Sequence, residues 1–130
     1  MNGKQARAYL KGKPESFEDF PFGPDVYVYK IVHETKGKMF ATLGYSDDIA
    51  RMNLKCDPEE AMALRDIFEA VVPGYHMNKA HWNTVILDGS IPTGEIERMI
   101  DRSFGLVVKG MKRAERQALE IRHGTDTIYR

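Results

Sequence analysis

The chain has only one cysteine and no long apolar run, and both features narrow what it can be. Cys56 alone cannot form an internal disulfide, which suits a reducing compartment. No apolar stretch approaches the roughly 18 residues of a membrane span. The first residues, MNGKQARAYLKGKPES, lack the apolar centre of a secretory signal. We therefore expect a cytoplasmic protein that does not enter a membrane.

The chain also lacks net charge, with 19 Lys and Arg against 19 Asp and Glu. A neutral total gives no general argument for nucleic acid or an anionic membrane as partner. The charge is unevenly distributed, however. Residues 1–13 carry four basic and no acidic side chains (+4), residues 106–130 six and three (+3), and residues 14–105 nine and sixteen (−7). The basic ends predict solvated helix faces or, if both fold to one side, a basic flank.

The pattern of apolar residues predicts the order helix, three-strand meander, helix, one or two further strands, helix. The expected helices are 5–12, 57–71 and a long one capped by Thr93, and the expected strands are 26–34, 39–45, 50–56 and 84–87. Short turns join strands into an antiparallel sheet. We expect an α+β two-layer sandwich with helices packed on one face of the sheet.

A length of 130 residues predicts one domain with its own core. We expect the core to span about residues 5–108 and a charged helical extension with a frayed tail to span 109–130. The segment KPESFEDFPFGPD contains three prolines and a glycine, which predicts a loop rather than a strand. Its aromatic residues are expected to insert into the core; they are Phe17, Phe20 and Phe22.

The third expected strand alternates between apolar and polar residues, so its two sides differ. The apolar residues are Met52, Leu54 and Cys56, and the polar ones are Arg51, Asn53 and Lys55. This alternation predicts a buried, unreactive Cys56 thiol. It also predicts a polar, basic outer face on this strand.

The segment PGYHMNKAHWNTVILDG, residues 73–89, is the richest in polar side chains. A zinc site needs three or four converging ligands, whereas His76 and His81 are five residues apart with no thiolate pair near them. Nucleophilic catalysis is not indicated either, because Cys56 is expected to be buried. No dinucleotide or Walker glycine pattern and no nucleophile elbow is present. The sequence predicts no enzyme, no cofactor and no metal site.

Binding of an anion or a nucleic acid fits this segment better. His76, Asn78, Lys79 and His81 supply donors for phosphate oxygens, and aromatic rings supply flat faces for a base or sugar. Two other interpretations stay open. The cluster can form a pocket for a small molecule or an acidic peptide, or it can be purely structural, with its side chains bonded and packed internally.

Five segments resemble, in order and spacing, the YjbR/MmcQ family of small bacterial proteins. They are EDFPFGPDVYVYKI, GKMFATL, LKCDPEEAMALR, PGYHMNKAHWNTVILDGSIP and MIDRSFGLVV, and together they reach from about Tyr9 to about Val108. The resemblance implies a CyaY-like (frataxin-like) fold. It also implies the family's description as DNA-binding, which rests on likeness to a double-wing domain whose sheet meets DNA. Frataxin-like iron binding does not follow, because the first helix here is basic.

These observations predict a monomeric, non-enzymatic domain that binds DNA through the polar sheet face and the segment from His76 to Trp82. With few phosphate contacts, binding is expected to be weak and to fall with salt. The candidate binding residues are Lys38, Arg51, Asn53, Lys55, Tyr75, His76, Asn78, Lys79, His81 and Trp82.

Overall fold

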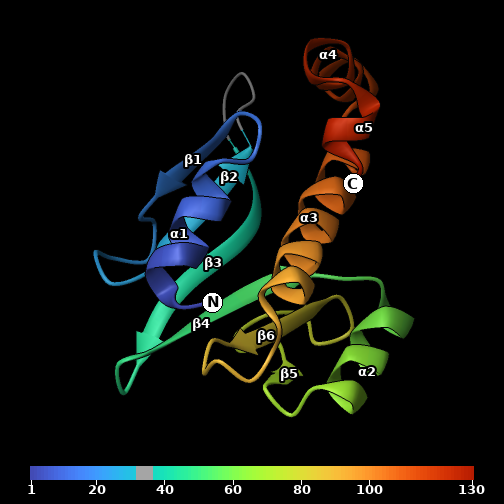
Figure 1. Cartoon of the computed structure of the whole chain (residues 1–130). Coiled ribbons are helices and arrows are strands. Elements are labelled where there is room, and N and C mark those ends of the chain that lie inside the picture. The colour runs from blue at the N-terminus through green and yellow to red at the C-terminus, as the bar shows by residue number, and fades with distance from the viewer. Residues whose placement is uncertain (32–36) are drawn as a thin grey trace.

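A computed structural model describes residues 1–31 and 37–130 of the chain. Six antiparallel strands form one twisted sheet in the order β1-β2-β3-β4-β6-β5 (Figure 1). The strands are β1 Ser16–Asp19, β2 Tyr27–Ile31, β3 Lys38–Ser46, β4 Ile49–Lys55, β5 Val71–Pro73 and β6 Trp82–Ile86. The helices are α1 Gly3–Lys11, α2 Pro58–Ile67, α3 Thr93–Lys109, α4 Arg113–His123 and α5 Thr125–Ile128.

The helices cover one face of the sheet and share one core with it. The long helix α3 runs along the middle of the molecule, with α1 beside the β1–β3 half and α2 beside β5 and β6 (Figure 1). The apolar stripes of these helices and the inner side chains of the sheet form a single buried cluster, which includes Leu10, Phe40, Met52, Leu64, Ile100 and Phe104. The expected α+β architecture with helices on one face is confirmed.

The hairpin of β3 and β4 fixes which side chains face away from the helices. Asp47 and Asp48 have φ angles of 52° and 64°, as a tight two-residue hairpin turn requires. On β4, Met52 and Leu54 are buried in the core while Arg51 is exposed. The alternation predicted for this strand is therefore confirmed.

The segment predicted to be a loop with buried phenylalanines instead contains β1. Glu18 pairs with Tyr29 and takes the position facing the helices, where its carboxylate accepts hydrogen bonds from the Tyr29 hydroxyl (2.7 Å) and Arg7 Nε (2.8 Å). Alternation then turns Phe17 outward. Phe17, Phe20 and Phe22 are 36%, 44% and 70% exposed, so the expectation that they fill the core is wrong.

The C-terminal part is also more ordered than predicted. The long helix ends at Lys109, and residues 113–123 form a separate helix rather than its continuation. The tail is not frayed, because α5 places Ile128 in the core. Gly105 of α3 lies against α5, where an added Cβ atom would be 3.5 Å from the Ile128 carbonyl, an ordinary contact distance.

The helix cap expected from Thr93 is absent, and α2 also begins without a side-chain cap. The residue before α3 is Pro92 rather than a capping Thr93, and Asp57 makes no side-chain cap for α2. Asp57 instead forms an ion pair with Arg102 of α3. The last part of the expected strand 26–34, residues 32–34, lies outside the described residues.

Candidate nucleic-acid interface

The face of the sheet that carries no helix, here called the open face, presents two parallel rows of side chains. Residues paired across antiparallel strands point to the same side. Since Arg51 points away from the core, its partner Ile86 shares the open face with it. The paired rows are Arg51, Asn53 and Lys55 on β4 and Ile86, Thr84 and Trp82 on β6.

The loop of residues 74–81 is tied down over this face. The backbone N–H of Tyr75 donates to Thr84 Oγ1 at 2.9 Å, and Asn53 Nδ2 donates to the Tyr75 carbonyl at 3.3 Å. The Thr84 hydroxyl in turn donates to Asn53 Oδ1. Asn53 was predicted as a binding residue, and the structure shows it positioning the loop.

Arg65 of α2 holds the other side of the loop. Its Nε donates to Asn83 Oδ1 at 2.7 Å, and its Nη2 donates to the carbonyl of Lys79 and, at 3.4 Å, to that of Trp82. Asn83 is only 2% exposed and also donates to the Ala61 carbonyl at 3.2 Å. Arg65 was not predicted from the sequence, because two of its three acceptors are backbone carbonyls that no motif reveals.

The predicted cluster within the loop divides into bonded and exposed side chains. Asn78 Oδ1 accepts a hydrogen bond from the Ala80 N–H at 3.0 Å, and Lys79 Nζ donates to the Gly74 carbonyl at 3.0 Å. Tyr75 and His76 are exposed, with ring centroids 4.0 Å apart. The His76 backbone has a φ of 58°, a left-handed conformation that sets the direction of the loop.

The remaining two residues of the segment lie at the far end of the loop. The His81 carbonyl accepts a hydrogen bond from the Cys56 N–H at 2.8 Å, and the His81 side chain is exposed. Trp82 is half-buried and pairs with Lys55 across the sheet. His81 and Trp82 therefore lie near Lys55, whereas Tyr75 lies near Asn53.

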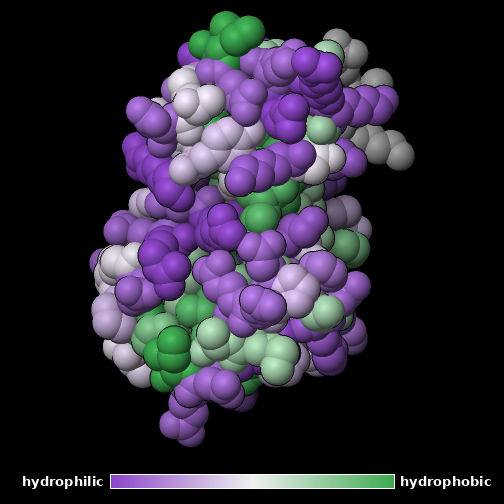
Figure 2. Space-filling view, turned by 90° about the vertical axis from the view of Figure 1, so that its right-hand side faces the viewer, coloured by the Kyte–Doolittle hydropathy of each residue, from purple (hydrophilic) through white to green (hydrophobic). Residues whose placement is uncertain are grey.

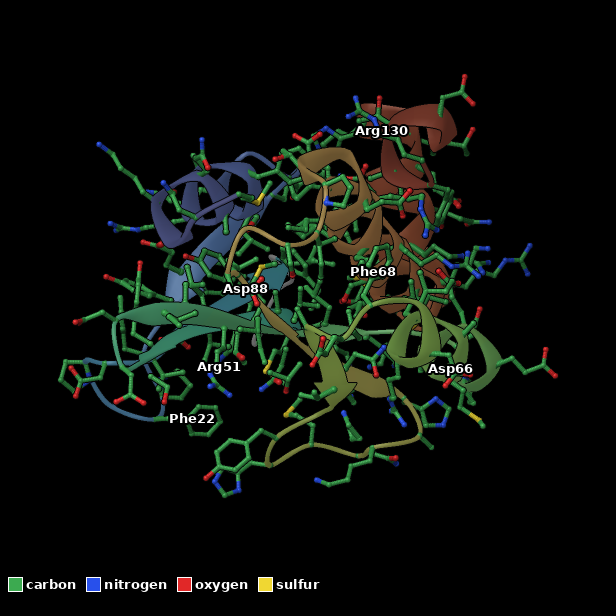
Figure 3. The ribbon with its side chains drawn as sticks, turned by 60° about the horizontal axis from the view of Figure 1, so that its bottom comes forward. Phe22, Arg51, Asp66, Phe68, Asp88 and Arg130 are labelled. Carbon is green, nitrogen blue, oxygen red and sulfur yellow. The ribbon has the colours of Figure 1, made fainter. Side chains whose placement is uncertain are left out.

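Within the described part of the chain, Arg51 has free hydrogen-bond donors, unlike the arginines of this protein that donate to carboxylates or carbonyls. It is exposed, and among the described residues it has no hydrogen-bond acceptor or ion-pair partner. It projects from the sheet away from the helices (Figure 3). The arginines that do have acceptors are Arg7, Arg65, Arg98, Arg102 and Arg122.

The loop between β1 and β2 reaches the open face beside Arg51. Gly44 pairs with Arg51, so a Cβ atom at Gly44 would point to the open face, and it would lie 4.0 Å from the Asp25 carbonyl. Figure 3 shows Phe22, from the same loop, next to Arg51. Phe22 was predicted to lie in the core, and its exposure on the surface was not expected. Phe22 stands between Pro21 and Gly23, and this order indicates a turn at the surface.

Lys38 does not join these residues. It pairs with Ile31, whose side chain is buried in the core, so the register places Lys38 on the helix side. It is also six residues from Gly44 along β3, which corresponds to roughly 20 Å. The structure thus brings together Arg51, Asn53, Tyr75 and His76, adds Phe22, and separates Lys38 from them.

Two further features of the described residues concern metal ligands and the single thiol. These residues contain no group of three or more His, Cys, Asp or Glu side chains that could hold a metal ion. Cys56 is 5% exposed, and burial raises the pKa of its thiol to about 11. None of the helices in residues 1–31 and 37–130 is long and apolar enough to cross a membrane.

Two cavities lie outside the predicted cluster. A cavity of about 10 Å³ lies between the sheet, α2 and α3, beside Cys56 and Arg102. A shallow depression of about 540 Å³ is lined by Arg7, Phe20 and Tyr27 with the adjacent Gly23 and Pro24. Neither is lined by residues of the segment from His76 to Trp82, so neither supports the pocket interpretation of that segment.

The side of the molecule formed by α2 and α4 is mostly hydrophilic (Figure 2). Its exposed large apolar residues are Met62 and Ile67 on α2 and Ile121 on α4. Apolar surface gathers low on this side, at the level of α2 (Figure 2).

Comparison with known proteins identifies relatives in sequence and in fold. The family model YjbR matches residues 11–106. The uncharacterized protein YbdF of Escherichia coli O157:H7 is 35% identical over 81% of each chain, and the uncharacterized protein YjbR of Escherichia coli K12 is 37% identical over 62% of this chain and 69% of its own. The crystal structure of Deinococcus radiodurans protein DR2400 superposes with a TM-score of 0.84 at 37% identity, covering 91% of this chain and 87% of that one. A Pseudomonas syringae crystal structure gives a TM-score of 0.70 at 34% identity, covering 82% and 99%.

Proposed function

We propose that this chain, which belongs to the YjbR family, binds DNA through its open face. One observation carries the proposal: Arg51 stands exposed on this face without an acceptor among the described residues, whereas Arg7, Arg65 and Arg102 donate to carboxylates or carbonyls within the protein. A guanidinium presents parallel N–H donors that match phosphate oxygens. An arginine without an internal acceptor keeps these donors for a ligand.

The surroundings of Arg51 suit a ligand that is both anionic and aromatic. Tyr75 and His76 present exposed rings from the loop tied to Asn53, and Phe22 presents an exposed ring next to Arg51. DNA offers phosphates for the guanidinium and bases for the rings. Lys55, two residues from Asn53 on the same face, supplies a second cation toward the Trp82 end.

The expected affinity is low and sensitive to salt. Asn53 and Lys79 make hydrogen bonds within the protein, so the open face has fewer free donors than the sequence suggests. The basic first helix adds little, because Arg7 and Lys11 contact Glu18 and Lys13 contacts Asp101. Association through few phosphate contacts weakens as added salt removes the gain from counterion release.

The test is fluorescence anisotropy with labelled single-stranded and duplex DNA at low and near-physiological ionic strength. Arg51→Gln removes the charge, and Arg113→Gln, an exposed arginine on α4, is the matched control. We expect Arg51→Gln to weaken binding about tenfold and to lower the salt slope by about one. Equal affinities of wild type and Arg51→Gln, or an equal loss in the control, would disprove the proposal.

A further inference from the structure

Two exposed aromatic residues, Phe22 and Tyr75, are carried by loops that contact the open face near Arg51. We propose that the open face takes an unpaired DNA strand, with bases stacked on Phe22 and on Tyr75 and the phosphate between them bound by Arg51. This inference rests on the proposed function and names the form of DNA involved. It depends on how the two rings are held, on the charge around Arg51 and on the spacing of the three residues.

Phe22 is presented by a loop that is itself anchored. Phe20 of the same loop packs edge-on against Tyr27 with ring centroids 5.3 Å apart. Gly23 follows Phe22 with a φ of 104°, a conformation that L side chains rarely adopt. Phe20 therefore fixes the loop, and the turn at Gly23 leaves the Phe22 side chain 70% exposed. An exposed phenylalanine of this kind provides a flat, apolar face for a ligand.

Tyr75 is held at both of its backbone polar groups. Its N–H donates to Thr84 Oγ1 and its carbonyl accepts from Asn53 Nδ2, yet its side chain is 67% exposed. The adjacent His76 ring supports one side of the phenol. The ring is thus positioned before a ligand arrives, which lowers the entropy lost on binding.

The charge around Arg51 is too small to favour a duplex. Lys30, on the same face, is paired with Asp19 at 2.6 Å, and Asp25, Asp47 and Asp48 are exposed in the adjoining turns. Duplex binding commonly rests on about 6–10 phosphate contacts. Paired bases also hide their faces in the helical stack, whereas an unpaired strand exposes them to aromatic side chains.

The spacing fits neighbouring nucleotides. Gly44, where the Phe22 loop contacts the sheet, is on the strand next to Arg51, and Asn53, which holds Tyr75, is two residues along the strand. Strand separation and rise per residue place these anchor points about 5 Å and about 7 Å from the Arg51 backbone. Both rings can therefore reach bases adjacent to one phosphate contact.

The experiment compares a labelled single-stranded oligonucleotide with a hairpin duplex of the same sequence, using Phe22→Ala, Tyr75→Ala and the control Ile121→Ala. Ile121 is 86% exposed on α4. Each aromatic variant should weaken single-strand binding about 5- to 150-fold, the equivalent of about 1–3 kcal/mol per stacked base. Ile121→Ala should bind like wild type, and Tyr75→Phe should retain binding because it keeps the ring.

A fluorescent variant separates stacking from a structural effect. Phe22→Trp should bind the single strand, and the bound DNA should quench the fluorescence of the added tryptophan. Without DNA, the thermal unfolding curve of this variant should match that of wild type. Preference for the duplex, or full binding by both alanine variants, would overturn the single-strand inference and leave the proposed function standing. Absence of binding to either form would overturn both.

Discussion

The Ser103 hydroxyl accepts a hydrogen bond from the backbone N–H of Lys55 at 2.8 Å. The same hydroxyl donates to the Phe40 carbonyl at 2.6 Å. The last paired residues of β3 and β4 are Ala41 and Leu54, so Phe40 and Lys55 lie just beyond the ladder. A side chain of α3 therefore satisfies the two backbone groups at the point where β4 leaves β3 and continues beside β6.

Ser103→Ala is expected to destabilise the domain. The substitution leaves the Lys55 N–H and the Phe40 carbonyl without their partner, which typically costs about 1–3 kcal/mol for buried groups. Urea unfolding followed by circular dichroism measures the change. Ser46→Ala, at the exposed end of β3, is the control and should change stability little. A Ser103→Ala protein as stable as wild type would show that this bridge contributes nothing.

The sequence predicted the elements whose burial pattern is local and strong. β4 alternates at every residue from Ala50 to Lys55, and α3 repeats its apolar residues at helical spacing, so both were found. The three-residue β5 and the four-residue β1 were not predicted. Each is too short to carry a pattern of its own and exists through pairing with β6 or β2.

The candidate site was predictable only in part, for reasons of register and exposure. The alternation of β4 correctly placed Arg51 and Lys55 on the open face. Lys38 was misplaced because the register shifts between Tyr29 and Lys30, and a shift of one residue moves a side chain to the opposite face. Phe22 was assigned to the core because the sequence does not show that its neighbour Phe20 already packs on Tyr27.

The Cys56 thiol is expected to be unreactive in the folded protein. Burial, with a smaller contribution from the carboxylates of Glu60 and Asp57, raises its pKa to about 11, so very little thiolate forms at neutral pH. Iodoacetamide at about pH 8 should modify it slowly in buffer and rapidly in denaturant, as followed by mass spectrometry. Equal rates in the two conditions would contradict this expectation.

Glu18 is expected to stabilise the fold above acidic pH. Hydrogen bonds from Arg7 hold the pKa of Glu18 below its ordinary value of 4.5, and the Tyr29 hydroxyl adds to this. A carboxylate with a lower pKa in the folded state contributes stability that is present above pH 4.5 and is lost as the pH falls through the folded pKa.

Glu18→Gln should therefore be less stable than wild type near neutral pH, and the difference should shrink below the ordinary carboxyl pKa. Chemical unfolding at a series of pH values measures the difference. Glu69→Gln removes an exposed carboxylate that has no partner in the described part of the chain, and it controls for net charge. A stability difference for Glu18→Gln that is constant with pH would argue against the Arg7 interaction as its source.

Arg65→Met is expected to loosen the 74–81 loop. The substitution removes the donors to Asn83 Oδ1 and to the carbonyls of Lys79 and Trp82, and it leaves a buried acceptor unsatisfied at a cost of about 1–3 kcal/mol. The hydrogen bond from the His81 N–H to the Asn78 carbonyl, within the loop, should then open more often.

Hydrogen exchange measured by NMR can locate this effect. The amides of Met77 and His81 should exchange faster in Arg65→Met, and by a larger factor than amides in the β4–β6 ladder, because the lost contacts are local. Arg113→Met, at an exposed position on α4, should leave the exchange rates of the loop amides and the ladder amides unchanged.

The 74–81 loop also carries Tyr75, so Arg65→Met should weaken single-strand DNA binding as well as the protection of the loop amides. Faster exchange without any loss of DNA binding would show that the ligand does not depend on the position of this loop.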